Sequence, residues 1–275
     1  MRFSNATLAG VTAATAALLV LRRKRHEQQV SERFAAASLE TLLNAIDAND
    51  AQTGAHVRRV ATYALILADA AGVSPHDSKV IERVALFHDI GKIHEALFDI
   101  IHDDSALSPA DRRAIATHPA RGAQVLSPLN GFYPELPAGV LAHHERWDGS
   151  GYPRGLKGRK IPLSARIVAI ADTFDAVTFR RRYQSPRSVE EGRVVICEGR
   201  GTQFDPELVD LFDFEGVFTR IVAASEVVAG WTPPIHHRRT GEDETDVPDI
   251  TFRWRPGRQG AKGRPASDQA RKTVR

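Results

Sequence analysis

The feature that most constrains how this chain can fold is a series of helical patterns separated by proline and glycine breaks. The i, i+3, i+4 and i+7 spacing of an amphipathic helix is met by Leu39, Leu42, Leu43 and Ile46. Between such patterns there is no convincing alternation of apolar and polar residues, which would indicate a strand. The sequence therefore predicts an all-α fold made of short helices.

Capping residues and breaks place the helix ends. Serine–proline pairs begin at Ser74 and Ser108, and a serine cap followed by proline is typical of a helix N-terminus. The longest glycine-rich interruption is "DGSGYPRGLKGRK" at 148–160, called the glycine loop below. We expect helices from about residue 31 onward and over 56–71, 75–91, 137–144, 162–178, 188–198 and 205–212.

Composition narrows the chemistry. The 275 residues are 42% hydrophobic and 26% charged, which is the balance of an ordinary folded soluble protein. Cys197 is the only cysteine, which excludes a disulfide framework and a thiolate metal cluster and fits a reducing compartment. The net charge of +3 hides eight Lys and Arg residues within 253–275, so the rest of the chain is close to neutral. DNA or RNA binding by the body is therefore not expected.

Residues 1–25 predict a membrane anchor with a basic flank. Residues 3–21 carry no charge, and their number approaches the roughly 20 residues that a helix needs to cross a bilayer. Four basic residues follow at 22–25, and basic residues stay on the cytoplasmic side. We therefore expect a single-pass protein of the inner (cytoplasmic) membrane with the domain that follows the anchor in the cytoplasm. A cleaved export signal, an interfacial helix and a disordered tail are alternatives, and export fits least because the charges follow the apolar stretch.

Behind the anchor we expect a linker helix over 26–35 and a folded domain over 36–231. From residue 232 to 275 the composition shifts to Pro, Gly, Arg and acidic residues, which bury little apolar surface. This basic tail is expected to be largely disordered, with contact to acidic lipids as an alternative.

Histidines and aspartates recur where helices end or bend. Taken singly, each histidine is better explained as a hydrogen-bonded core or surface residue. Asp172 is more informative, because it lies in the apolar stretch "ARIVAIADTFDAV", where an ionised carboxylate is costly unless it is paired or binds a cation. The candidate residues are His56, His88, Asp89, His118, His143, His144 and Asp172.

Taken together, these side chains predict a metal site. Neutral imidazoles and carboxylates without cysteine suit iron, manganese or another divalent transition metal. Two such ions close together can activate water and hold a phosphate oxygen, which is a common route to phosphoester hydrolysis.

Six stretches occur in the order and approximate spacing of a known family: "DAQTGAHVRRV", "HDIGK", "HP", "HHERWDGSGYP", "ARIVAIADTFDAVT" and "GTQFDPELV". Over about residues 36–213 the chain resembles the HD-GYP domain, a branch of the HD metal phosphohydrolases. The resemblance implies an all-α, HD-type helical bundle. It also implies a metal-dependent phosphodiesterase that hydrolyses cyclic di-GMP to pGpG, GMP or both in bacterial second-messenger signalling.

Matching positions imply individual roles. The seven candidate histidines and aspartates would be the metal ligands. Lys92 would lie near the metals and the substrate phosphate, and Asp175 would support Lys92. The expected catalytic residues are thus Lys92, Asp89 and Asp175. The expected substrate-binding residues are Lys92, Gly149, Gly151, Tyr152, Pro153, Arg181 and Gln184.

The chain departs from the family pattern at three places. Gln52 stands where some members have a glutamate that helps hold a third metal, so we expect two ions, iron or manganese. Gln184 replaces a phosphate-contacting cation, and the segment 94–107, which borders the site entrance in the family, lacks proline and glycine. The alternatives are a receptor with little catalysis and a phosphohydrolase acting on another cyclic dinucleotide. The expected partners are the dinucleotide and the membrane, and a homodimer is an option.

Overall fold

The computed structural model describes residues 5–93, 108–179 and 186–229, with side chains from residue 20 to residue 226 in these ranges, except 49 and 51. In these ranges every regular element is a helix, and the extended pairing is limited to an isolated bridge between Arg200 and Phe204. The all-α prediction is confirmed. Arg181, Gln184, the entrance segment 94–107 and the tail 232–275 lie outside the described residues.

The helices match most of the predicted ranges, with short 3₁₀ turns between them. The α-helices are α1 (Asn5–Asn49), α2 (Ala51–Ala70), α3 (Pro75–Phe87), α5 (Pro109–Ile115), α6 (His118–Leu126), α7 (Glu135–Ala142), α8 (Leu163–Thr178), α9 (Val189–Glu198), α10 (Pro206–Asp213) and α11 (Glu215–Ala229). The 3₁₀ turns are η1 (Ile90–Ile93), η2 (Ser127–Leu129) and η3 (Gly158–Lys160).

Serine caps explain where several helices begin. The hydroxyl of Ser74 accepts a hydrogen bond from the backbone N–H of Asp77 at 3.1 Å, with Pro75 in the first turn of α3. Ser108 forms a capping box, in which the Asp111 carboxylate also accepts from the Ser108 backbone N–H at 2.8 Å. Each bond satisfies a backbone donor that the first turn leaves without a helical partner. The predicted helix starts at these two serines are confirmed.

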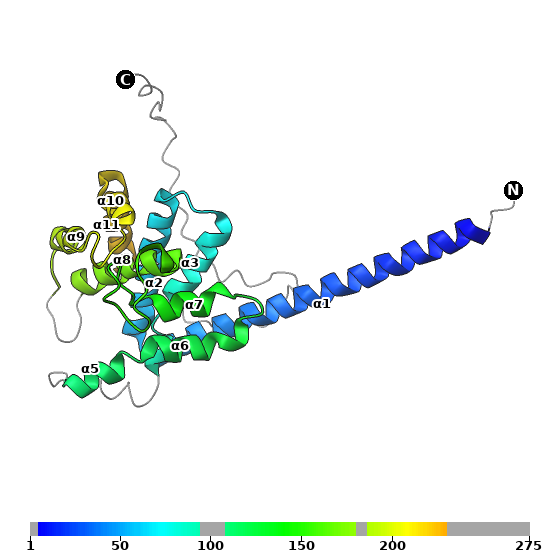
Figure 1. The fold of residues 1–275 in the computed structure, drawn as a ribbon, viewed down its shortest axis with the longest axis horizontal. Helices are drawn as coiled ribbons and strands as arrows, with labels where there is room; N and C mark the ends of the chain where they lie inside the picture. The colour runs from blue at the N-terminus through cyan, green and yellow to red at the C-terminus, as the bar shows by residue number, and fades with distance from the viewer. Residues whose placement is uncertain (1–4, 94–107, 180–185, 230–275) are drawn as a thin grey trace, which may run out of the picture.

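The core lies around α2, which packs against α3, α8 and α11 (Figure 1). Tyr63 of α2 meets Phe174 of α8 edge to face, with ring centroids 5.6 Å apart. Phe174 in turn contacts the rings of Phe212 and Phe218, which α10 and α11 supply. These large buried side chains fix α2 and α8 side by side. The same two helices carry His56 and Asp172, so the core aligns two candidate metal ligands.

Helix α1 differs from the predicted boundaries. It runs without a break from Asn5 to Asn49, although the sequence pattern suggested a start near residue 31 and a linker over 26–35. Leu39 and Ile46 in its C-terminal part are buried, while its N-terminal part projects from the body (Figure 1). Among the described residues no helix is both long and apolar enough to cross a membrane, and the anchor remains a prediction.

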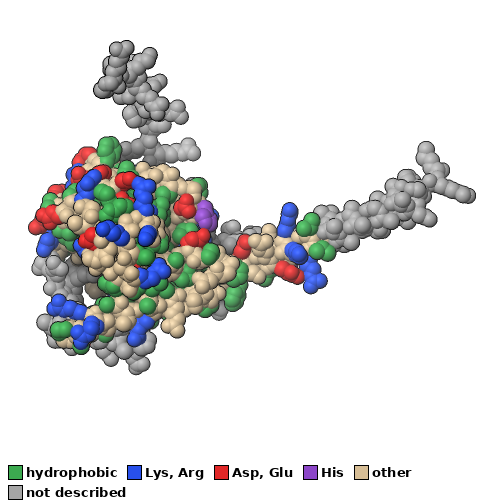
Figure 2. Space-filling view, viewed as in Figure 1, with side chains coloured by type: hydrophobic (Ala, Val, Ile, Leu, Met, Phe, Trp, Pro, Cys, Tyr) green, Lys and Arg blue, Asp and Glu red, His purple; other side chains and the backbone are tan. Residues whose placement is uncertain are grey.

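Charged side chains of both signs are interspersed over the visible face of the body (Figure 2). Several form exposed pairs, such as Arg200 with Asp210 at 2.7 Å and Arg159 with Glu207 at 2.6 Å. Exposed pairs of this kind contribute little to stability.

Candidate metal centre

Helix ends bring the candidate ligands to one place. His88 caps the C-terminus of α3 and Asp89 follows it, while His118 is the first residue of α6. His143 caps the C-terminus of α7, and His144 comes next in the chain. The side chains of His88, Asp89, His118 and His143 are almost completely buried. His56 comes from α2 and Asp172 from α8, so five helices of the fold converge on the site.

Backbone carbonyls set the tautomers of three histidines. In His88, His118 and His143, Nδ1 lies 2.8, 2.7 and 2.6 Å from the carbonyl oxygen three residues earlier in the chain. A carbonyl oxygen only accepts, so Nδ1 must carry the proton and donate it. In the neutral ring Nε2 then holds a lone pair, which is what a metal ion binds.

The Asp89 carboxylate lies between two sets of these nitrogens. Its Oδ2 is 3.4 Å from Nε2 of His88 and 3.8 Å from Nε2 of His56. Its Oδ1 is 3.2 Å from Nε2 of His118 and 4.0 Å from Nε2 of His143. One carboxylate thus presents one oxygen to each set, the arrangement expected of a ligand shared by two ions.

Two groups of potential ligand atoms flank Asp89. His56, His88 and Asp172 form one group, and within it the ligand atoms lie within 4.8 Å of one another. His118, His143 and His144 form the second group by the same measure. The two groups supply nitrogen and oxygen donors without sulfur, which suits divalent transition metals.

Atoms left without partners show that the residues fit bound cations. Nε2 of His56, Nε2 of His88 and Oδ1 of Asp89 are buried with no hydrogen-bond partner among the described residues. Nε2 of His118 and Nε2 of His143 face each other at 3.1 Å, although both carry lone pairs in the tautomers set by the backbone. Buried polar atoms without partners are costly, and a cation between them removes the cost.

Electrostatics favour ligation at neutral pH. Burial, with the neighbouring histidines, holds the pKa of His143 well below its usual value, and burial lowers the pKa of His144 to about 4. Burial opposes ionisation of Asp89, but Lys92, His88 and His118 hold its pKa well below the usual range. Burial lowers the pKa of His88, yet the Asp89 charge outweighs burial and raises it. The centre therefore combines two imidazoles that stay neutral, those of His143 and His144, with an anion that attracts positive charge.

Asp175 positions a ligand instead of supporting Lys92. Its Oδ2 accepts a hydrogen bond from Nδ1 of His56 at 2.7 Å, and its two oxygens accept from Nε and Nη2 of Arg59 at 2.6 and 2.9 Å. The Arg59 guanidinium also lies 3.9 Å from the ring centroid of Phe179. Lys92 pairs with Asp89, so the expected support of Lys92 by Asp175 is wrong. A carboxylate behind a ligating histidine fixes its tautomer and raises its basicity.

Lys92 lies beside Asp89, one of the candidate metal ligands. It sits in η1, and its Nζ is 2.6 Å from Oδ2 of Asp89. The Lys92 side chain keeps about a quarter of its surface exposed, at 27%. The ammonium group can therefore reach a ligand in solution while it stays next to the carboxylate.

The glycine loop covers one side of His144. The ring of Tyr152 stacks on His144, with centroids 5.0 Å apart and an interplanar angle of 27°, and its peptide bond to Pro153 is cis. Gly149 has a φ of 87°, which other residues adopt rarely. A Cβ on Gly151 would lie 2.3 Å from the backbone nitrogen of Arg146, so only glycine lets the loop approach this closely.

A second loop holds the base of the glycine loop. The backbone N–H groups of Trp147 and Asp148 donate to the carbonyl oxygens of Gln203 and Thr202, at 3.1 and 2.8 Å. This contact gives the stretch "GTQFDPELV" a structural role at the candidate site. Of the expected substrate-binding residues, Tyr152 stacks on His144, a candidate metal ligand.

Two neighbours of the site were missed by the sequence analysis. Arg59 pairs with Asp175, and nothing in the local pattern of α2 pointed to this partner 116 residues away. Glu145 is 4% exposed and directly follows the paired histidines in "HHERWDGSGYP". The position of an acidic residue inside that motif was the one signal in the sequence. Its two oxygens accept hydrogen bonds from the backbone N–H groups of Arg154 and Leu156, and the sequence does not show where these groups lie.

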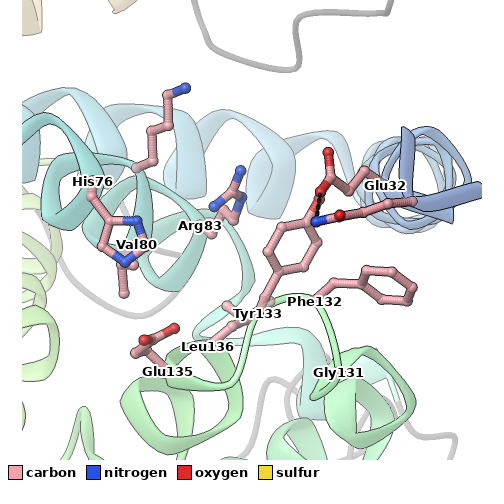
Figure 3. A pocket seen from close by; sticks show the side chains of 11 residues that line it. Glu32, His76, Val80, Arg83, Gly131, Phe132, Tyr133, Glu135 and Leu136 are labelled. Atoms are coloured by element: carbon pink, nitrogen blue, oxygen red, sulfur yellow. Dashed lines mark hydrogen bonds between the residues drawn. The ribbon is translucent and has the colours of Figure 1, made fainter. Parts of the chain in front are cut away.

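A cavity of about 500 Å³ lies elsewhere, between α1, α3 and the start of α7 (Figure 3). None of the candidate site residues lines it. The Arg83 guanidinium lies 4.2 Å from the ring centroid of Tyr133, and Lys79 is nearby on α3. Glu32 and Glu135 also line the cavity, so two acidic side chains balance two basic ones. This balance leaves the cavity little net charge with which to attract a phosphate.

The chain is similar to proteins of known families. A family model described as an HD domain matches residues 40–208. A cyclic di-GMP phosphodiesterase of Thermotoga maritima is 39% identical over 183 residues, which is 66% of this chain and 49% of that protein. The 3'3'-cGAMP-specific phosphodiesterase 2 of Vibrio cholerae is 38% identical over 172 residues, which is 62% of this chain and 33% of that protein.

A solved structure shows the same fold. The crystal structure of a cyclic GMP-AMP specific phosphodiesterase of Vibrio cholerae superimposes with a TM-score of 0.51 at 22% identity. The match covers 71% of this chain and 53% of that one. The chain spans a third to a half of the length of the two curated relatives.

Proposed function

The chain belongs to the HD domain family, and on this premise we propose that it is a metal-dependent phosphodiesterase of cyclic di-GMP or a related cyclic dinucleotide. The family assignment made from the motifs is confirmed by the match over residues 40–208. The activity, the substrate and the partners remain proposals, since the relatives are longer proteins.

The observation that carries the proposal is the shared position of Asp89. One oxygen faces His118 at 3.2 Å and the other faces His88 at 3.4 Å, with buried nitrogens on both sides. A mononuclear structural site has no need for a carboxylate presented to two separate groups of imidazoles. Two bound divalent cations would supply Lewis acidity and an activated water for cleavage of a phosphodiester.

The protein side chains would orient and neutralise the substrate. Lys92 Nζ, held beside Asp89 at 2.6 Å, places positive charge where negative charge develops on the phosphate oxygens. Burial, together with the charges of Asp89 and Asp172, raises the pKa of Tyr152 to about 12, so its phenol stays neutral against His144. A neutral aromatic wall suits the base or sugar of a nucleotide better than its phosphate. We propose pGpG, GMP or both as products from cyclic di-GMP.

We propose two ions of iron or manganese for the centre. The two groups of donors flanking Asp89 support the number. Imidazole and carboxylate donors without cysteine support the choice of metal. Metal content of the purified full chain, measured per chain after loading with either ion, tests both parts.

Hydrolysis assays test the activity and the substrate. The metal-loaded full chain is incubated separately with cyclic di-GMP, cyclic di-AMP and 3'3'-cGAMP, and the products are separated by chromatography. We expect hydrolysis of at least one of these compounds, and its loss in Asp89→Asn. Tight binding of a dinucleotide without turnover, with the metal content confirmed, would instead show a receptor.

We also propose that the N-terminal region attaches the protein to the cytoplasmic membrane. The uncharged residues 3–21 and the basic residues 22–25 support this location. Fractionation of the full chain and of a chain lacking residues 1–25 provides the test. Equal recovery of both chains in the membrane-free fraction would contradict the proposal.

A further inference from the structure

The side chain of Glu145 is buried behind the metal ligands and binds the glycine loop. Its Oε1 accepts a hydrogen bond from the backbone N–H of Arg154 at 2.8 Å, and its Oε2 accepts from the backbone N–H of Leu156 at 2.9 Å. We propose that Glu145 is a positioning residue, which holds the glycine loop where Tyr152 covers His144 and thereby sets one wall of the substrate site.

The chemistry of a carboxylate fits this task. An ionised carboxylate only accepts hydrogen bonds, and burying it is costly unless donors surround it. Here the donors belong to the loop backbone, so the burial is compensated only while residues 154–156 stay in place. Opening of the loop would break both hydrogen bonds, so that the two backbone N–H groups and the Glu145 carboxylate would lose their partners. These two hydrogen bonds therefore favour the closed position of the glycine loop.

Other contacts hold the loop at different points. Asp148 Oδ1 accepts from the Ser150 backbone N–H at 2.8 Å, and the Gly158 N–H donates to the carbonyl oxygen of Trp147 at 2.9 Å. Leu156 packs beside a small apolar cluster that includes Ile161. These contacts fix the two ends of the glycine loop. The hydrogen bonds that Glu145 accepts fix its middle, at residues 154 and 156.

Tyr152 connects this position to the candidate site. Its backbone N–H donates to the carbonyl oxygen of His144 at 3.2 Å, and its ring stacks on the His144 imidazole. Arg154, which Glu145 binds, is two residues further along the chain. A loop held at both His144 and Arg154 leaves Tyr152 little freedom. Both Glu145 oxygens bind the loop backbone, so its effect on substrate binding passes through Tyr152; this part of the inference depends on the proposed function.

Glu145→Gln tests the inference with a side chain of nearly the same shape. The amide has one accepting oxygen, and its NH₂ group would face a backbone N–H that also donates. We expect the loop to open more often, and therefore tryptic cleavage after Arg154, Lys157 or Arg159 to become about tenfold faster. Fragments are identified by mass, because the full chain offers other cleavage sites. We expect KM for the cyclic dinucleotide to rise about tenfold, with kcat changed less than about threefold.

Glu135→Gln is the matched control, since it removes the same charge from an exposed position at the other end of α7. Metal content per chain should be equal in the wild type and both variants. The inference would be overturned if Glu145→Gln and Glu135→Gln had equal rates of loop cleavage and equal KM values. It would also be overturned if Glu145→Gln lost metal while its rate of loop cleavage stayed unchanged. If Glu145→Gln does not fold, Glu145→Asp, which draws the carboxylate back, should show the same faster cleavage. A wild-type chain without turnover refutes the proposed function, but the cleavage comparison still decides the role of Glu145.

Discussion

Replacing Asp175 with asparagine separates the positioning of a metal ligand from the stability of the fold. The wild-type carboxylate accepts from His56 Nδ1 and from two nitrogens of Arg59. In Asp175→Asn, either orientation of the amide turns its NH₂ group toward one of these donors. If the NH₂ faces His56, the imidazole must accept at Nδ1 and carry its proton on Nε2, where the metal would bind.

The structure sets the size of both effects. Loss of a carboxylate behind a ligating histidine lowers metal affinity about 10- to 100-fold, which is about 1.4 to 2.7 kcal/mol. Removing one partner of a buried ion pair costs about 3 to 5 kcal/mol, and we expect the lower end. The reason is that the Arg59 side chain is 12% exposed and also stacks on Phe179.

Two measurements on the full chain keep the effects apart. Urea unfolding of the metal-free protein gives the stability change without linkage to the metal. Competition with a calibrated chelator gives the metal affinity. Asp210→Asn is the matched control, because it removes a carboxylate from the exposed pair with Arg200 and should change neither value appreciably. Wild-type metal affinity in a folded Asp175→Asn protein would refute the role assigned to Asp175.

Three further outcomes are expected. Asp89→Asn should weaken metal binding at both positions, whereas His144→Ala should leave about one ion per chain. Plasma mass spectrometry counts the ions. Equal losses of metal in both variants would contradict the sharing of Asp89 by two ions. Gly151→Ala should lower the free energy of unfolding by about 1 to 3 kcal/mol, because the added Cβ would lie 2.3 Å from a backbone nitrogen. Gly131→Ala is the control and should leave the free energy of unfolding unchanged, because nothing lies within 4 Å of its added Cβ. Equal stabilities of the two variants would refute the close approach at Gly151. Chelation should lower the melting temperature, since an ion at about 1,000 times its Kd adds about 4 kcal/mol; an unchanged melting temperature would argue against bound metal.

The parts of the fold that the sequence predicted are those that depend on local interactions. Ser74 and Ser108 begin helices because each hydroxyl caps a backbone N–H three residues ahead. The predicted start of α1 near residue 31 was wrong, because the side-chain pattern was given more weight than the absence of a helix-breaking residue. The basic residues at 22–25 changed the side-chain pattern, but no glycine or proline lies between Val11 and Asp50 to interrupt the helix.

The convergence of the candidate ligands could be predicted because they lie in motifs. The residues that position them were harder to predict. Asp175 was assigned to Lys92, but its partners are His56 and Arg59 on α2, and such a pairing depends on how α2 packs against α8. Glu145 binds backbone N–H groups of the glycine loop, which carry no signature in the residue types. Contacts of this kind appear only when the chain is folded.

We propose that Asp89 is shared by two metal ions in a centre that hydrolyses a cyclic dinucleotide. The most direct test measures metal per chain and hydrolysis on the same preparation of the full chain, before chelation, after chelation and after reloading with manganese or iron(II). On this proposal we expect about two ions per chain and turnover that disappears and returns with them. A chain that holds two ions yet hydrolyses none of the cyclic dinucleotides, or one that remains active after the metal is removed, would contradict it.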